Sequence, residues 1–228
     1  MTARSILCYA HKGRPNPGWP PNALRSIEES IQAGVAGLEL DINETRDGEF
    51  LVFHDHSLEQ HRIGSLALSE ASILFKDRGE SAPLLGEVID LCVGKTRLML
   101  DLKQMRSLDK LARMLKQRVP IRDLTLTSFT HPYIRELSAS FPEASLGILT
   151  GCYLVDPIHA MRSARAGLLV QQFPLVDGQL VSQVHNNGYE IYVWDVGSEV
   201  DIRETVSLGV DGLIADDPVL ASQISSGL

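Results

Sequence analysis

The chain has 228 residues, of which 44% are hydrophobic and 22% charged, and its formal net charge is −8. This is an ordinary globular balance, with enough apolar side chain for a substantial core. A negative net charge disfavours nonspecific binding to nucleic acid or to anionic membranes. We therefore expect no nucleic-acid partner. We also expect a single domain covering residues 1–228, present as a monomer or a homodimer.

The first residues carry no recognisable targeting signal. Their apolar run is only about five residues long, too short for a secretory signal peptide. No stretch approaches the roughly 18 apolar residues that cross a bilayer, so we expect a cytoplasmic protein without stable membrane insertion. Cys8, Cys92 and Cys152 are odd in number and show no CxxC spacing. They are expected to be buried free thiols.

Short apolar, β-branched runs alternate with helical patterns along the chain. A first strand is expected at residues 6–10. It precedes a Pro-dense loop and a helix that starts near Asn22, a residue type favoured at N-caps. The next strand, at residues 37–42, leads through an Asp-Gly turn into residues 49–54. Because no helix separates these two runs, the sequence predicts a β-hairpin.

The rest of the chain repeats a strand-and-helix pattern. Strands are expected at residues 97–102, 124–129, 145–149, 168–173, 189–194 and 212–215. Helices are expected near residues 85–93, 108–118, 132–140, 157–166, 178–187 and 200–208, with a short closing helix. With the hairpin arm set aside, eight βα units predict an α/β fold, a TIM (β/α)8 barrel with little or no insertion domain. A doubly wound open sheet is the alternative, but its G-x-G-x-x-G fingerprint is absent.

Acidic side chains stand where the predicted strands end, which is where barrel active sites lie. Glu39 and Asp41 are two residues apart on one strand, so both point to the same face. Two carboxylates held there repel each other unless a cation neutralises them, and a hard divalent metal ion does so through oxygen ligands. Asp101 and Lys103 repeat the spacing, so that Asp101 can supply a third carboxylate and Lys103 can reach an anion. A network of ion pairs at the barrel rim is the structural alternative.

Two histidines also follow strand ends. His11 comes directly after the first strand, and His54 ends the hairpin arm. Imidazoles near a metal site suit the cleavage of a phosphodiester, because one can accept a proton while the other donates one. A zinc site that uses His56 and His61 is disfavoured, because oxygen ligands dominate the remaining set.

The order of these motifs closely resembles the glycerophosphodiester phosphodiesterase family, and the resemblance runs from His11 to Pro218. The matching segments are, in order, His11-Lys12-Gly13, Glu39-Leu40-Asp41, Thr45-Arg46-Asp47-Gly48, His54-Asp55, Asp101-Leu102-Lys103, Ser128-Phe129, Trp194, and Gly209-Val210-Asp211-Gly212 through Asp216-Asp217-Pro218. No single segment is specific, but eight in the correct order are hard to explain by chance.

The resemblance implies a role for each matched residue. His11 and His54 would be the catalytic acid–base pair, and Glu39, Asp41 and Asp101 would hold one divalent metal ion, Mg²⁺ or Ca²⁺. Substrate or its phosphate would contact Lys12, Lys103 and Trp194. In the implied reaction a hydroxyl beside the phosphate attacks it, and water then opens the cyclic phosphate. The products would be sn-glycerol 3-phosphate and an alcohol.

Some positions depart from the family pattern. Lys12 replaces an arginine and Asp101 a glutamate, while Pro21-Asn22-Ala23 stands where the family carries an acid. The Asp-x-Lys variant is similar to the sphingomyelinase D branch, whose reaction ends at the cyclic phosphate, so a lyase of that kind is one alternative. A non-catalytic phosphoester-binding barrel is another, and a metal-dependent lyase acting on a carbon skeleton is a third.

Overall fold

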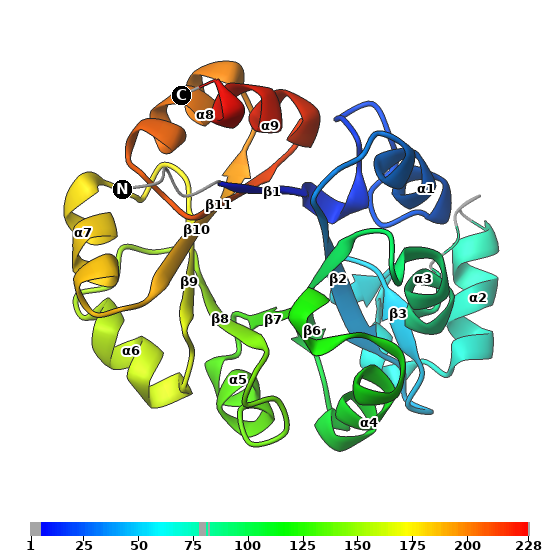
Figure 1. The fold of residues 1–228 in the computed structure, drawn as a ribbon. Helices are drawn as coiled ribbons and strands as arrows, with labels where there is room; N and C mark the ends of the chain where they lie inside the picture. Colours follow the sequence, from blue (N-terminus) through cyan, green and yellow to red (C-terminus); the bar gives the residue numbers. More distant parts are fainter. Residues whose placement is uncertain (1–5, 78–80, 82, 228) are drawn as a thin grey trace.

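In a computed structural model, which describes residues 6–77, 81 and 83–227, parallel strands close into a barrel with helices around it (Figure 1). The strands follow the order β1, β11, β10, β9, β8, β7, β6, β2. The pairing of β1 with β2 completes the ring. The predicted TIM barrel is therefore confirmed, and the open sheet is excluded.

The elements lie close to their expected positions. The barrel strands are β1 (Leu7–Ala10), β2 (Gly37–Glu44), β6 (Arg97–Gln104), β7 (Leu124–Ser128), β8 (Ser145–Thr150), β9 (Leu168–Gln172), β10 (Glu190–Val196) and β11 (Gly212–Ala215). The outer helices are α1 (Leu24–Gln32), α3 (Leu85–Cys92), α4 (Leu108–Arg118), α5 (His131–Leu137), α6 (Pro157–Ala164), α7 (Gly178–Asn186), α8 (Glu199–Ser207) and α9 (Pro218–Ser226).

The barrel interior has an apolar floor beneath its polar end. One buried cluster fills it, formed by Tyr9, Met99, Leu149, Leu168, Val170, Tyr192 and Ile214. A larger cluster packs between the strands and the surrounding helices. The floor also needs one glycine, since a Cβ built at Gly37 would lie 2.3 Å from Cε1 of Tyr9. The strands are thus apolar along their lower part, which leaves their carboxyl ends for chemistry.

The predicted hairpin is present but short. The strand β3 (Phe50–Val52) pairs antiparallel with β2, and Ile42 lies opposite Val52. We expected the arm to extend to residue 54. It stops two residues earlier, so His54 lies on a segment beyond the regular strand pairing.

Residues 57–77 fold into a small addition beside the hairpin, and the fold has no larger insertion in its described part. It comprises β4 (Ser57–Leu58), β5 (His61–Arg62), η2 (Ile63–Ser65) and α2 (Leu68–Asp77). These elements bury their own apolar cluster, formed by Leu51, Leu58, Ile63, Leu66, Ala71 and Phe75. The two-residue strands could not be expected from the sequence, because they leave no readable periodicity. The ten-residue helix α2 was not predicted either.

The interpretation of Asn22 as a helix cap is wrong. The helix α1 starts at Leu24 with Ala23 at the N-cap, while Asn22 adopts a left-handed backbone with φ of 57°. Asparagine tolerates this conformation better than most residues. Its side chain is therefore turned away from the helix and toward the barrel, where it contacts Asp41.

The expectation of three buried thiols holds for Cys8 and Cys92 and is wrong for Cys152, which is exposed. Cys152 belongs to the loop after β8, a part of the barrel rim that the sequence pattern does not place. Among the helices in the described residues, none combines the length and apolar character needed to cross a membrane.

Candidate active site

Three acidic side chains meet at the carboxyl ends of two neighbouring strands. Glu39 and Asp41 extend inward from β2, and Asp101 lies directly across from Asp41 on β6. All three are buried, at 6%, 2% and 3% exposure. Each offers a carboxylate oxygen, and these oxygens lie within 4.8 Å of one another. We call this set the acidic triad. The prediction that these residues converge is confirmed.

The acidic triad is poorly accommodated as three anions. Burial, reinforced by the charge of Asp41, raises the pKa of Glu39 to about 7. Burial also raises the pKa of Asp101 to about 6, with Asp41 adding to the effect and Lys103 opposing it. Asp41 alone is favoured as an anion: burial opposes its ionisation, but Lys103 and His54 outweigh burial and lower its pKa. An additional positive charge at this place would favour the ionised form of all three carboxyl groups.

The donor set fits a hard divalent cation. It supplies carboxylate oxygens, the ligands that Mg²⁺ and Ca²⁺ prefer. Oδ1 of Asp101 is buried and has no hydrogen-bond partner within the described part of the chain. A buried acceptor without a partner is costly, and a metal ligand role explains it. The acidic triad is thus a site suited to one divalent metal ion.

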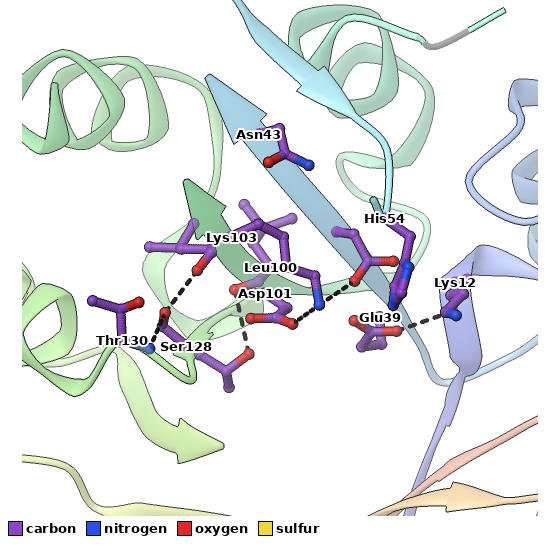
Figure 2. A network of polar contacts seen from close by, with 12 residues as sticks. Lys12, Glu39, Asn43, His54, Leu100, Asp101, Lys103, Ser128 and Thr130 are labelled. Carbon is purple, nitrogen blue, oxygen red and sulfur yellow. Dashed lines mark hydrogen bonds and ion pairs between the residues drawn. The ribbon is translucent and has the colours of Figure 1, made fainter. Parts of the chain in front are cut away.

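Lys103 lies between two of the acids. Its Nζ is 2.9 Å from Oδ1 of Asp41 and also contacts Oδ2 of Asp101 (Figure 2). Burial alone would lower the pKa of Lys103, but Asp101 and Asp41 outweigh it and raise the pKa above its usual value. Lys103 is therefore cationic at neutral pH. Its predicted contact with a substrate anion would add to these two ion pairs.

His11 is held by groups from both ends of the chain. It begins the short η1 (His11–Gly13) after β1, and its Nδ1 lies 2.8 Å from Oδ1 of Asp216, which follows β11. The guanidinium of Arg14 donates to the same oxygen at 2.7 Å. The hydrogen bond from His11 lowers the pKa of Asp216, against the effect of burial. With Nδ1 tied to a carboxylate, Nε2 remains for proton exchange.

Neither Arg14 nor Asp216 was assigned a role from the sequence. Asp216 stands at a strand end, which is a usable signal. Arg14 lies in the Pro-dense loop, and nothing in its local sequence points to a partner 202 residues away.

His54 makes a similar pair in a more open setting. Its Nδ1 is 2.7 Å from Oδ1 of Asp55, the next residue. The side chain of His54 is 45% exposed and that of Asp55 is 65% exposed. His54 follows β3 and lines the same cavity as His11.

Lys12 and Asn22 contact the acidic triad directly. The backbone N–H of Lys12 donates to Oε2 of Glu39 at 3.0 Å (Figure 2). The amide of Asn22 donates to Oδ2 of Asp41 at 2.8 Å. The tight turn around Lys12 depends on Gly13, whose φ is +66° and whose added Cβ would lie 2.8 Å from a methyl group of Leu40.

The acidic triad, the two lysines and both histidines line one cavity of about 230 Å³ at the carboxyl end of the barrel. It contains each residue predicted for the site: His11, Lys12, Glu39, Asp41, His54, Asp101, Lys103 and Trp194. Trp194 forms an apolar wall with Phe129, with the two rings edge to face and 5.5 Å apart. Phe129 itself was not assigned a role from the sequence, although it also faces Nζ of Lys103 at 5.7 Å.

Comparison with solved structures shows the same fold. A phosphodiesterase from Oleispira antarctica, solved in complex with the product sn-glycerol-3-phosphate, superposes with a TM-score of 0.85 at 22% identity, covering 97% of this chain and 96% of that one. A glycerophosphodiester phosphodiesterase from Parabacteroides distasonis gives a TM-score of 0.84 at 22% identity, with 98% of both chains covered.

Sequence comparison identifies the family. The chain is 29% identical to a glycerophosphodiester phosphodiesterase of Caldanaerobacter subterraneus, over 93% of this chain and 94% of that one. It is 26% identical to a glycerophosphodiester phosphodiesterase of Bacillus altitudinis, over 95% and 96%. The pattern of the glycerophosphoryl diester phosphodiesterase family matches residues 11–73 and 98–220. The chain belongs to the glycerophosphoryl diester phosphodiesterase family.

Proposed function

We propose that this protein hydrolyses glycerophosphodiesters to sn-glycerol 3-phosphate and an alcohol, with His11 and His54 as the acid–base pair. One observation carries the proposal: two imidazoles, each with Nδ1 held by a carboxylate, enter one cavity together with the acidic triad. Two related proteins named as glycerophosphodiester phosphodiesterases support it. So does the product found in the Oleispira antarctica structure.

Glu39, Asp41 and Asp101 would hold one divalent ion, Mg²⁺ or Ca²⁺, whose charge stabilises the negative charge that develops on the phosphate oxygens. Lys103, kept cationic beside two of these acids, adds a positive charge at the same place. Lys12 also lines the cavity, where its ammonium group can reach a phosphate oxygen. These groups position the diester between the two histidines.

The chemistry then needs two proton transfers in each half of the reaction. One histidine accepts the proton of the substrate hydroxyl that attacks phosphorus, and the other donates a proton to the departing alcohol. In the second half the roles reverse, as water opens the cyclic phosphate to the monoester. A second hollow of about 530 Å³ shares Lys12 and His54 with the cavity, which offers room for the departing alcohol.

The experiment is an assay of purified protein on glycerophosphocholine, glycerophosphoethanolamine, glycerophosphoglycerol and a lysophospholipid. Each would be incubated with Mg²⁺, with Ca²⁺ and with chelator, and products would be followed by phosphorus NMR. We expect a metal-dependent phosphomonoester. The double variant His11→Ala/His54→Ala, prepared identically, controls for contaminating phosphodiesterases. A cyclic phosphate that persists would show that the protein is a lyase and not a hydrolase. An absence of turnover would favour a non-catalytic phosphoester-binding barrel.

A further inference from the structure

We propose that Asn43 is a positioning residue for His54, because its side-chain amide binds the two backbone carbonyls that flank this histidine. The inference rests on the proposed function, in which His54 exchanges a proton with substrate. Asn43 lies outside the motifs matched in the sequence, between Asp41 and Thr45.

Asn43 continues the inward-facing row of β2. It stands two residues after Asp41 and four after Glu39, so all three side chains share one face of the strand. Figure 2 shows it above the acidic triad, toward the end of β2. The residue is fully buried, at 0% exposure. It is therefore fixed by the barrel while its amide reaches the segment that carries His54.

The amide makes two hydrogen bonds to that segment. Nδ2 of Asn43 donates to the carbonyl of Phe53 at 2.7 Å and to the carbonyl of Asp55 at 3.2 Å. Both partners only accept hydrogen bonds, so the NH₂ group rather than the carbonyl must face them. One rigid side chain thus fixes the backbone on either side of His54.

His54 depends on this backbone anchor more than a packed residue would. The pairing of β3 with β2 ends at Val52. The next backbone bonds run from N–H of Phe53 to the carbonyl of Asp41 at 2.9 Å and from N–H of Ile63 to the carbonyl of His56 at 3.0 Å, and neither involves His54 itself. The side chain of His54 is 45% exposed and its partner Asp55 is 65% exposed. Side-chain packing therefore restrains the imidazole little.

The other half of the amide supports the same conclusion. Oδ1 of Asn43 is buried and accepts no hydrogen bond in the part of the chain that the structure describes. Buried polar atoms are nearly always paired, and an exception calls for an explanation. The explanation here is that an NH₂ group is needed at this position, and the unpaired oxygen accompanies it.

The test is Asn43→Leu, which keeps the size of the side chain and removes both donors without adding charge near the acidic triad. Because small misplacements of a catalytic group cost up to about 100-fold in rate, we expect kcat to fall by about 10- to 100-fold while KM changes by less than about threefold. Asn43→Ala is the second variant, used with the same limits if Asn43→Leu does not fold.

Gln171→Met is the matched control. Gln171 is also fully buried, its Oε1 also lacks a partner among the described residues, and its Nε2 donates to the carbonyl of Cys152 at 3.3 Å, in a loop without a proposed catalytic residue. This variant loses a comparable buried amide, so its thermal unfolding should resemble that of Asn43→Leu. Its kcat should stay within about twofold of the wild-type value.

A double-mutant cycle then separates positioning from a general structural effect. In a His54→Ala background, Asn43→Leu should change kcat by less than about twofold, whereas in a His11→Ala background the full loss should persist. Wild-type kcat in Asn43→Leu, or an equal loss in both backgrounds, overturns the inference alone. Wild-type activity in His54→Ala overturns the inference and the proposed role of His54 together.

Discussion

His11 and His54 share one kind of partner but stand in unlike surroundings. The side chain of His11 is 12% exposed, and its partner Asp216 also binds the guanidinium of Arg14. The side chain of His54 is 45% exposed and its partner Asp55 is 65% exposed. Exposed ion pairs contribute little to holding a geometry, because water screens them and the side chains stay mobile. The barrel therefore orients one histidine through charge and the other through its backbone.

The largest effect is expected for a substitution in the acidic triad, on which both histidine sides of the site depend. Asp41→Ala should lower kcat/KM by at least about 10³-fold, because a bound metal supplies several kcal/mol of transition-state stabilisation. We expect Mg²⁺ or Ca²⁺ to raise the Tm of the wild-type protein, and this rise should be absent in Asp41→Ala. Activity assays and thermal unfolding with and without metal measure both. Asp90→Ala, at an exposed surface acid, is the control, and a normal metal response in Asp41→Ala would contradict the ligand assignment.

The histidines themselves come next. His11→Ala and His54→Ala should each lower kcat by about 10² or more, because each removes one of the two proposed proton-transfer groups. Circular dichroism should show an unchanged fold. Near-wild-type turnover in either variant would remove that residue from the mechanism. The comparison between His11 and His54 would then have no catalytic meaning.

The two carboxylate partners test the comparison most directly. Asp216→Asn should lower kcat by about 10- to 100-fold, since it removes the negative charge that holds both His11 and Arg14. Asp55→Asn should lower kcat by less than about threefold, since the backbone still holds His54. Steady-state kinetics of the pair decide the matter. Equal losses would show that exposure does not distinguish the two sides.

The last prediction concerns stability rather than turnover. Asp216→Asn should lower the free energy of unfolding by about 1–3 kcal/mol at pH 6, the usual range for a hydrogen bond to a charged group. The pKa of Asp216 is lowered in the folded protein from its ordinary value of 3.8. Its carboxylate therefore stabilises the fold fully above that value, and loses this effect as the pH falls through the lower folded pKa. Urea unfolding should show the difference from wild type shrinking below pH 3.8; a difference independent of pH would contradict the assignment.

The barrel and the acidic triad could be predicted from the sequence because both follow from short-range rules. Strand side chains alternate, so Glu39 and Asp41 must share a face, and parallel strands bring their carboxyl ends together, which adds Asp101. The two histidines were also placed by their positions at strand ends, and the order of the motifs implied their roles.

The supporting contacts could not be predicted, because they depend on how loops meet. Arg14 donates a hydrogen bond to Asp216, an aspartate far along the chain. Asn22 is a residue type favoured at helix N-caps, and only its left-handed backbone turns its side chain toward Asp41. Asn43 looks like an ordinary strand residue until the hairpin arm is seen to end at Val52.

The pairing of β1 with β11 has a consequence for the biosynthesis of the protein. Tyr9 on the first strand pairs with Ile214 on the last, and this joint sets His11 beside Asp216. On the ribosome, the residues of the acidic triad and both histidines are therefore synthesised about a hundred residues before Asp216, the partner of His11. Premature termination before residue 216 yields a product in which His11 has no carboxylate partner. The contact between His11 and Asp216 therefore requires that the last strand of the barrel pairs with the first.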